Sequence, residues 1–139
     1  MKINYFLYIL IYIYLAHIDI FASSLQKLRE VSLKKDQLFK MVIFYDNHKK
    51  LFQMRWTLFV NDGLVVLRSY DKIVAQNVLY MQNANRSFLV KLMPMGDIFY
   101  NVPYLLVKFQ AFKNNKAIFQ LYLSDDRGQI GLKYLKNKN

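Results

Sequence analysis

Histidine and carboxylate side chains could support acid–base or metal chemistry in this chain. Their small number and their spacing do not match a known catalytic or metal-binding motif. The 139 residues include two histidines, His17 and His48, and no cysteine. Structural metal sites draw on several Cys and His ligands at short spacing, and the sequence holds no such cluster. His48 lies in a turn segment and is followed by Lys49 and Lys50, with no partner for catalysis beside it in the sequence. We therefore expect neither a metal site nor histidine catalysis.

Asp125 and Asp126, followed by Gly128, come closest to a cation-binding loop. An EF-hand loop alternates its acidic positions and ends in a glutamate, whereas these two aspartates are adjacent and favour a turn. The sequence also lacks a G-x-S-x-G motif and a glycine-rich phosphate loop. We predict no catalytic residue and no cofactor. A hydrolase, the disfavoured alternative, would need His48 or an acidic pair inside a pocket.

The chain is strongly basic, with a net charge of +11 from 20 lysines and arginines against nine acidic residues. Such an excess acts on association rather than on fold. The basic residues are spread along the chain, so a solvated basic surface explains them as well as a binding site does. For an exported protein, an anionic lipid, a cell-wall polymer or an acidic protein is a more accessible target than a nucleic acid.

The N-terminus has the order of features that is typical of a secretory signal peptide. Lys2 supplies a basic start, residues 5–16 are apolar or aromatic, and small residues occur at 22–24. The apolar run is too short to span a bilayer comfortably. We predict a signal peptide over residues 1–24, cleaved after Ala22 or Ser24, and export to the periplasm or beyond. The alternative is an uncleaved signal that anchors the chain in the inner membrane.

The rest of the chain divides into a polar segment and one all-β domain. Ser23 and Gln26 could form a capping box, and residues 25–37 are therefore expected to form a polar arm or short helix. Residues 38–139 contain about eight segments rich in β-branched and aromatic residues, separated by turn residues. This spacing favours an antiparallel β-sandwich, immunoglobulin-like or similar, with a small barrel as the alternative. The expected strands are 38–46, 51–60, 64–70, 73–81, 87–93, 104–113, 117–124 and 129–135.

The last three of these strands have matching apolar phases. Residues 105, 107, 109 and 111 form one apolar face, and residues 119, 121 and 123 form the next. A three-residue loop at 113–115 and a four-residue loop at 125–128 would bring these faces together with residues 130, 132 and 134. We expect the three strands to form one antiparallel meander.

The clearest local signal is a β-hairpin over residues 51–70. The even positions 52–60 are apolar, and Asp62-Gly63 reads as a two-residue turn. This register pairs Trp56 with Ser69 and buries Trp56. It also places Arg55, Arg68 and Tyr70 together on the opposite, polar face.

Function follows from these features only as an expectation. We expect an exported cell-envelope module that binds or scaffolds other proteins, through an exposed strand edge or an aromatic and basic face. Arg55, Arg68 and Tyr70 are the expected contact surface. The alternative is a periplasmic carrier or sensor of an apolar or anionic ligand, which would need a deep cavity between the sheets or inside a barrel.

Overall fold

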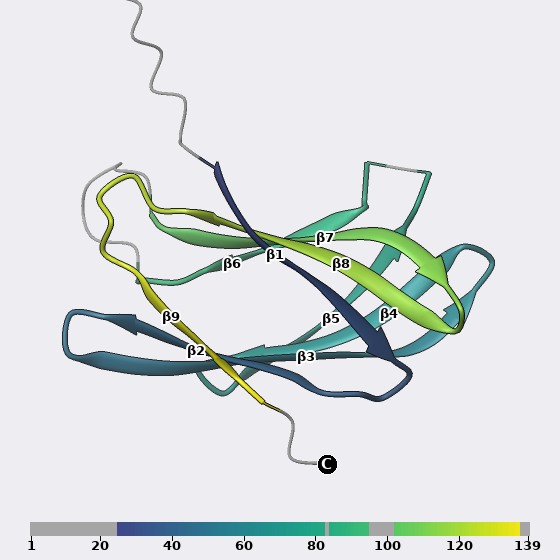
Figure 1. The fold of residues 1–139 in the computed structure, drawn as a ribbon, viewed down its shortest axis with the longest axis horizontal. Helices are drawn as coiled ribbons and strands as arrows, with labels where there is room; N and C mark the ends of the chain where they lie inside the picture. The colour runs from purple at the N-terminus through teal and green to yellow at the C-terminus, as the bar shows by residue number, and fades with distance from the viewer. Residues whose placement is uncertain (1–24, 83, 95–101, 137–139) are drawn as a thin grey trace, which may run out of the picture.

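The computed structural model of the chain describes residues 25–82, 84–94 and 102–136. These residues form nine strands in two antiparallel sheets and no helix, which Figure 1 shows as two facing layers. The predicted β-sandwich is confirmed, with one strand more than expected. Within the described ranges, no helix has the length and apolar character needed to cross a membrane. The expected signal peptide, residues 1–24, lies outside the described residues. The strands are β1 (Leu25–Lys34), β2 (Phe39–Tyr45), β3 (His48–Val60), β4 (Gly63–Tyr70), β5 (Ile73–Tyr80), β6 (Ser87–Lys91), β7 (Tyr104–Lys113), β8 (Lys116–Ser124) and β9 (Gly131–Leu135).

The two sheets divide the chain unevenly. One sheet has four strands in the order β1-β8-β7-β6, and the other has five in the order β5-β4-β3-β2-β9. The first and last strands, β1 and β9, therefore belong to different sheets, and they lie at neighbouring edges of the sandwich (Figure 1).

The space between the sheets is filled by apolar side chains that alternate along the strands. Phe52 and Met41 come from the five-stranded sheet, and Phe109, Phe119 and Leu121 come from the four-stranded sheet; all are fully buried. Trp56 is also buried, as predicted, and its indole Nε1 donates a hydrogen bond of 2.7 Å to the carbonyl oxygen of Leu33 on β1. The Trp56 indole thus ties the two sheets together.

Residues 25–34 form strand β1 instead of the predicted polar arm or short helix. Val31 and Leu33 are buried two residues apart, which is strand spacing, and they lie opposite Phe119 and Ala117 of β8. The helical spacing of Leu25, Leu28 and Val31 competed with this pattern in the sequence. Backbone pairing with β8, which is distant in the sequence, stabilises this segment as a strand instead of a helix.

Strand β9 does not complete the predicted meander. β7 and β8 pair as expected, but β9 pairs with β2 of the other sheet, because β1 occupies the remaining edge of β8. The intervening loop is organised by Asp125, whose Oδ2 accepts a hydrogen bond from the backbone amide of Ile130 at 2.8 Å. Gly128 adopts a positive φ of 63° there, a conformation that glycine tolerates well. The Asp125 segment is therefore a turn that carries the chain between sheets.

The β3–β4 hairpin turns one residue earlier than predicted. Val60 pairs with Gly63, so Asn61 and Asp62 are the two turn residues, with φ of 49° and 60°. Two positive φ values define the type I′ turn that suits the twist of a hairpin, and Asn and Asp tolerate them. Gly63 lies inside strand β4, where a Cβ would approach the Tyr80 ring to 3.0 Å.

Two β-bulges then change the side-chain phase at one end of the sandwich. Thr57 is the extra residue in β3, and Gln110 is the extra residue in β7. Each bulge turns the following phenylalanine inward, and Phe59 and Phe112 stack with ring centroids 4.1 Å apart. Leu58 and Ala111, predicted to face inward, consequently lie on the outer side. Upstream of the β7 bulge the expected register holds, with Leu105 opposite Leu123.

Candidate interaction surface

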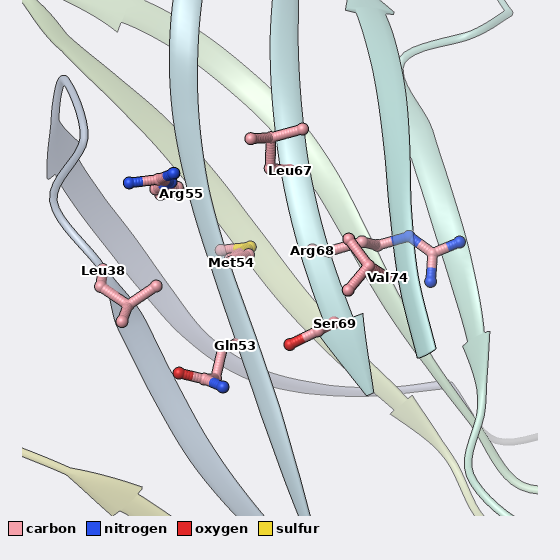
Figure 2. A pocket seen from close by; sticks show the side chains of 8 residues that line it. All are labelled: Leu38, Gln53, Met54, Arg55, Leu67, Arg68, Ser69 and Val74. Atoms are coloured by element: carbon pink, nitrogen blue, oxygen red, sulfur yellow. The ribbon is translucent and has the colours of Figure 1, made fainter. Parts of the chain in front are cut away.

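The three residues expected to form one contact surface are divided between the two faces of the five-stranded sheet. Met54, opposite Arg68, is buried, whereas Leu67, opposite Arg55, lies on the outer face. Arg55 is exposed, while Arg68 and Tyr70 are half-buried on the side that faces the other sheet. Figure 2 shows the Arg55 and Arg68 side chains leaving their strands in different directions. The Thr57 bulge is the physical reason for this correction, because it shifts the pairing of β3 with β4 by one residue.

Arg68 makes contacts that hold the sandwich together. Its Nε donates a hydrogen bond of 2.8 Å to the Asn77 side-chain oxygen on β5. Its guanidinium carbon lies 4.9 Å from the centre of the Phe88 ring on β6, in the other sheet. Burial lowers the pKa of Arg68 from its ordinary value. Arg68 is therefore engaged within the fold.

Tyr70 makes a second link between the sheets. Its hydroxyl donates a hydrogen bond of 2.6 Å to the carbonyl oxygen of Leu92, just after β6. Burial is the main reason why the pKa of the Tyr70 phenol is raised, so the phenol keeps its proton and remains a donor. Of the three expected surface residues, Arg55 alone remains on the outer face.

The outer face of β3, β4 and β5 carries an apolar patch that we call the outer patch: Leu58, Val60, Val65, Val78 and Tyr80. Leu58, Val65 and Val78 lie opposite one another across the three strands. Leu58 is 49% exposed, Val60 52%, Val78 40% and Tyr80 37%. An apolar cluster of this kind on a sheet face is typical of an interaction site. Arg55, opposite Leu67, borders it.

A shallow groove of about 200 Å³ lies on the outer face, farther from the Asn61-Asp62 turn than the outer patch. Arg55 and Gln53 of β3, Ser69 of β4 and Val74 of β5 lie along it, as Figure 2 shows. The groove is open to solvent and combines polar with apolar side chains. It could accept side chains of a docked protein.

A second hollow, of about 420 Å³, lies along the seam where the edges of β1 and β9 meet. Arg29, Glu30, Tyr134 and Lys136 are among the residues that line it. The guanidinium carbon of Arg29 lies 4.6 Å from the centre of the Tyr134 ring. The lining is mixed, because buried core residues Val31, Leu33 and Phe39 contribute to it beside these polar and charged side chains.

Among the described residues, strand β5 forms an exposed edge of its sheet, and its composition is unusual. Ile73 and Val74 point to opposite faces, yet each is 74% exposed. The segment Ile73–Tyr80 contains no charged residue. By contrast, the edge strands β1, β6 and β9 contain lysines, β6 and β9 have only five residues each, and β1 has a bulge. Charges, short length and bulges are the devices that protect edges from pairing, and β5 has none of them.

Sequence reasoning identified β5 as a strand but missed its role as an unprotected edge. β5 pairs with β4 without interruption from Ile73 to Tyr80. The available signal was the run of uncharged residues 73–85, between Lys72 and Arg86, which includes the whole strand.

The histidine that was considered for catalysis packs against a neighbouring aromatic ring. His48 is the first residue of β3, and its ring stacks on Tyr45 with centroids 5.1 Å apart. In the described part of the chain, no three His, Asp or Glu side chains gather where they could hold a metal ion.

Comparisons of the chain with protein-family models, with curated proteins and with solved structures found no match.

Proposed function

We propose that this chain is an exported cell-envelope protein that binds or scaffolds another protein through the outer patch and the adjoining Arg55. The outer patch carries the proposal, because it places exposed leucine, valine and tyrosine side chains on one sheet face. Large buried side chains such as Phe52, Phe109 and Phe119 occupy the interior, where a carrier would need space for an apolar ligand. Protein–protein contact therefore fits the described surface better than ligand storage.

Export is supported by the N-terminal sequence pattern. A basic residue, an apolar run and small residues occur in the order that a signal peptide requires. Cleavage after Ala22 or Ser24 would leave every described strand intact, because β1 begins at Leu25. An uncleaved signal would instead tether the same sandwich to the inner membrane.

The seam between β1 and β9 supports the second candidate function, a carrier or sensor of an anionic ligand. Arg29 and Lys136 supply positive charge there, and Tyr134 supplies a ring. Glu30 in the same lining opposes an anion, which makes this the weaker candidate.

Site-specific cross-linking tests the protein-binding function. The chain has no cysteine, so one introduced cysteine gives a unique attachment point for a photoactivatable cross-linker. Leu58→Cys places it in the outer patch. Leu89→Cys is the matched control, because Leu89 is similarly exposed, at 54%, on the outer face of the four-stranded sheet.

The expected result is that Leu58→Cys captures one reproducible envelope protein in the native host and Leu89→Cys does not. Adding Val65→Lys, which places a charge in the patch, should abolish the capture while leaving the fold intact by circular dichroism. Equal capture at both positions, or capture that survives Val65→Lys, would reject the outer patch as the binding surface.

A further inference from the structure

We infer that β5 pairs edge to edge with β5 of a second copy of this chain, joining two five-stranded sheets into one continuous sheet. This inference concerns the main-chain edge of β5, whereas the proposed function concerns the side chains of the outer patch; the two have Val78 in common. It rests on the proposed function only in that both describe a protein-binding module.

The backbone groups of β5 that point away from β4 determine which of its residues could pair with a second copy. The backbone amide of Tyr80 donates to the carbonyl oxygen of Asn85 at 3.1 Å, so it points away from β4. Main-chain groups alternate in direction along an antiparallel strand. The amides and carbonyls of Val74, Gln76 and Val78 therefore also point to the open edge.

These three residues are symmetric about Gln76. A two-fold axis through Gln76 places Val74 opposite Val78 of the second copy and Gln76 opposite its own counterpart. Each such pair exchanges two main-chain hydrogen bonds. A register centred on Asn77 would instead require the Tyr80 amide, which Asn85 already engages. The register centred on Gln76 is therefore favoured, because it pairs all three outward-pointing residues and leaves the Tyr80 amide with Asn85.

The side chains fit this register on both faces. On the outer face, Val74 and Val78 meet across the axis, on either side of the two Gln76 side chains. On the inner face, Ile73 lies opposite Leu79 of the second copy. Ile73 and Val74 are each 74% exposed in one copy, and a single pairing strand would cover both.

Charge also favours the uncharged edge for self-association. Two copies with a net charge of +11 each repel one another. Pairing through β1, β6 or β9 would bring further lysines together, whereas Ile73–Tyr80 opposes no like charges. A self-complementary contact of this kind closes as a dimer, because its two-fold axis uses both β5 edges.

Charge substitution at the axis tests the inference. Gln76→Lys and Gln76→Glu each place like charges opposite one another in a dimer, and each should therefore be monomeric by analytical ultracentrifugation of the purified full-length chain. An equimolar mixture of the two variants should recover the dimer, because opposite charges then meet. Gln53→Lys, on the outer face of the internal strand β3, is the control and should remain dimeric.

Introduced cysteines test the register. Gln76→Cys should form a disulfide-linked dimer on oxidation, because paired residues lie within about 6 Å between Cα atoms. Val74→Cys and Val78→Cys should not cross-link separately but should do so when mixed. A monomeric wild-type chain, or two Gln76 charge variants that both stay dimeric, would overturn the inference.

The two proposals fail separately. Loss of the dimer in Gln76→Lys with unchanged capture at Leu58→Cys supports self-pairing and leaves the partner-binding function in place. A wild-type monomer that still captures a partner at Leu58→Cys would reject self-pairing alone.

Discussion

At the residue scale, Arg55 and Arg68 show how one bulge separates side chains that look equivalent in the sequence. Alternation predicts that Arg68 shares the polar face with Arg55, but the Thr57 bulge and the turn at Asn61-Asp62 place it opposite buried Met54. Arg68 then satisfies its Nε with Asn77 and packs on Phe88. The burial of Trp56, in contrast, was predictable, because it lies before the bulge.

Arg68→Ala should reduce the free energy of unfolding by about 1–3 kcal/mol, because it removes a hydrogen bond, a cation–π contact and a packed aliphatic stem. Arg55→Ala is the matched control and should change it by less than about 0.5 kcal/mol. Urea denaturation followed by circular dichroism measures both values. Equal effects of the two substitutions would contradict the division of these arginines between the two faces.

At the element scale, most strands were predictable as segments, and their partners were not. β-branched and aromatic composition, with stretches of alternation, identifies β2 to β8 as strands. It cannot reveal that β1 pairs with β8 or that β9 pairs with β2, since these pairings join distant segments. The bulges escaped prediction for a related reason. Phe59 and Phe112 face inward because they stack on each other across the sandwich.

The turn between β3 and β4 gives a direct prediction at this scale. Asp62 adopts a φ of 60°, which glycine adopts more readily than any other residue, so Asp62→Gly should stabilise the fold by about 0.5–1 kcal/mol. Gly63→Ala should destabilise it, because the new Cβ would meet the Tyr80 ring at 3.0 Å and the Val60 carbonyl oxygen at 3.2 Å. Shifts of the urea midpoint in opposite directions are expected. A stabilising Gly63→Ala would be incompatible with the observed turn.

At the scale of the whole molecule, the net charge of +11 opposes compaction. The composition gave this charge directly, but the sequence could not say that β5 would be an uncharged edge among charged ones. The position of each strand in its sheet is set by the pairing of all nine strands. The net charge can therefore be predicted from composition alone, whereas the exposed edge of β5 can be recognised only when the order of the strands is known.

Screening should consequently stabilise the protein. Raising sodium chloride from about 10 mM to about 200 mM should increase the free energy of unfolding, on the order of 1 kcal/mol, because the screening length falls. A variant with Lys34→Glu and Lys35→Glu has a net charge of 11 − 4 = +7, and its response to salt should be smaller. A free energy that falls with salt, or an equal response in the variant, would show that self-repulsion is not the governing effect.

The pairing of β1 with β8 has a consequence for the order of events during synthesis. β1 is the first described strand to be made, but its partner is complete only when residue 124 has been added. Folding therefore requires closure of a very long loop, which places this sandwich among slow folders, on the order of milliseconds to seconds. Until then β1 has no partner strand, although β2 to β5 can already pair with one another. The two layers therefore close only late in synthesis, which would favour passage through a narrow secretion channel if the chain is exported as we propose.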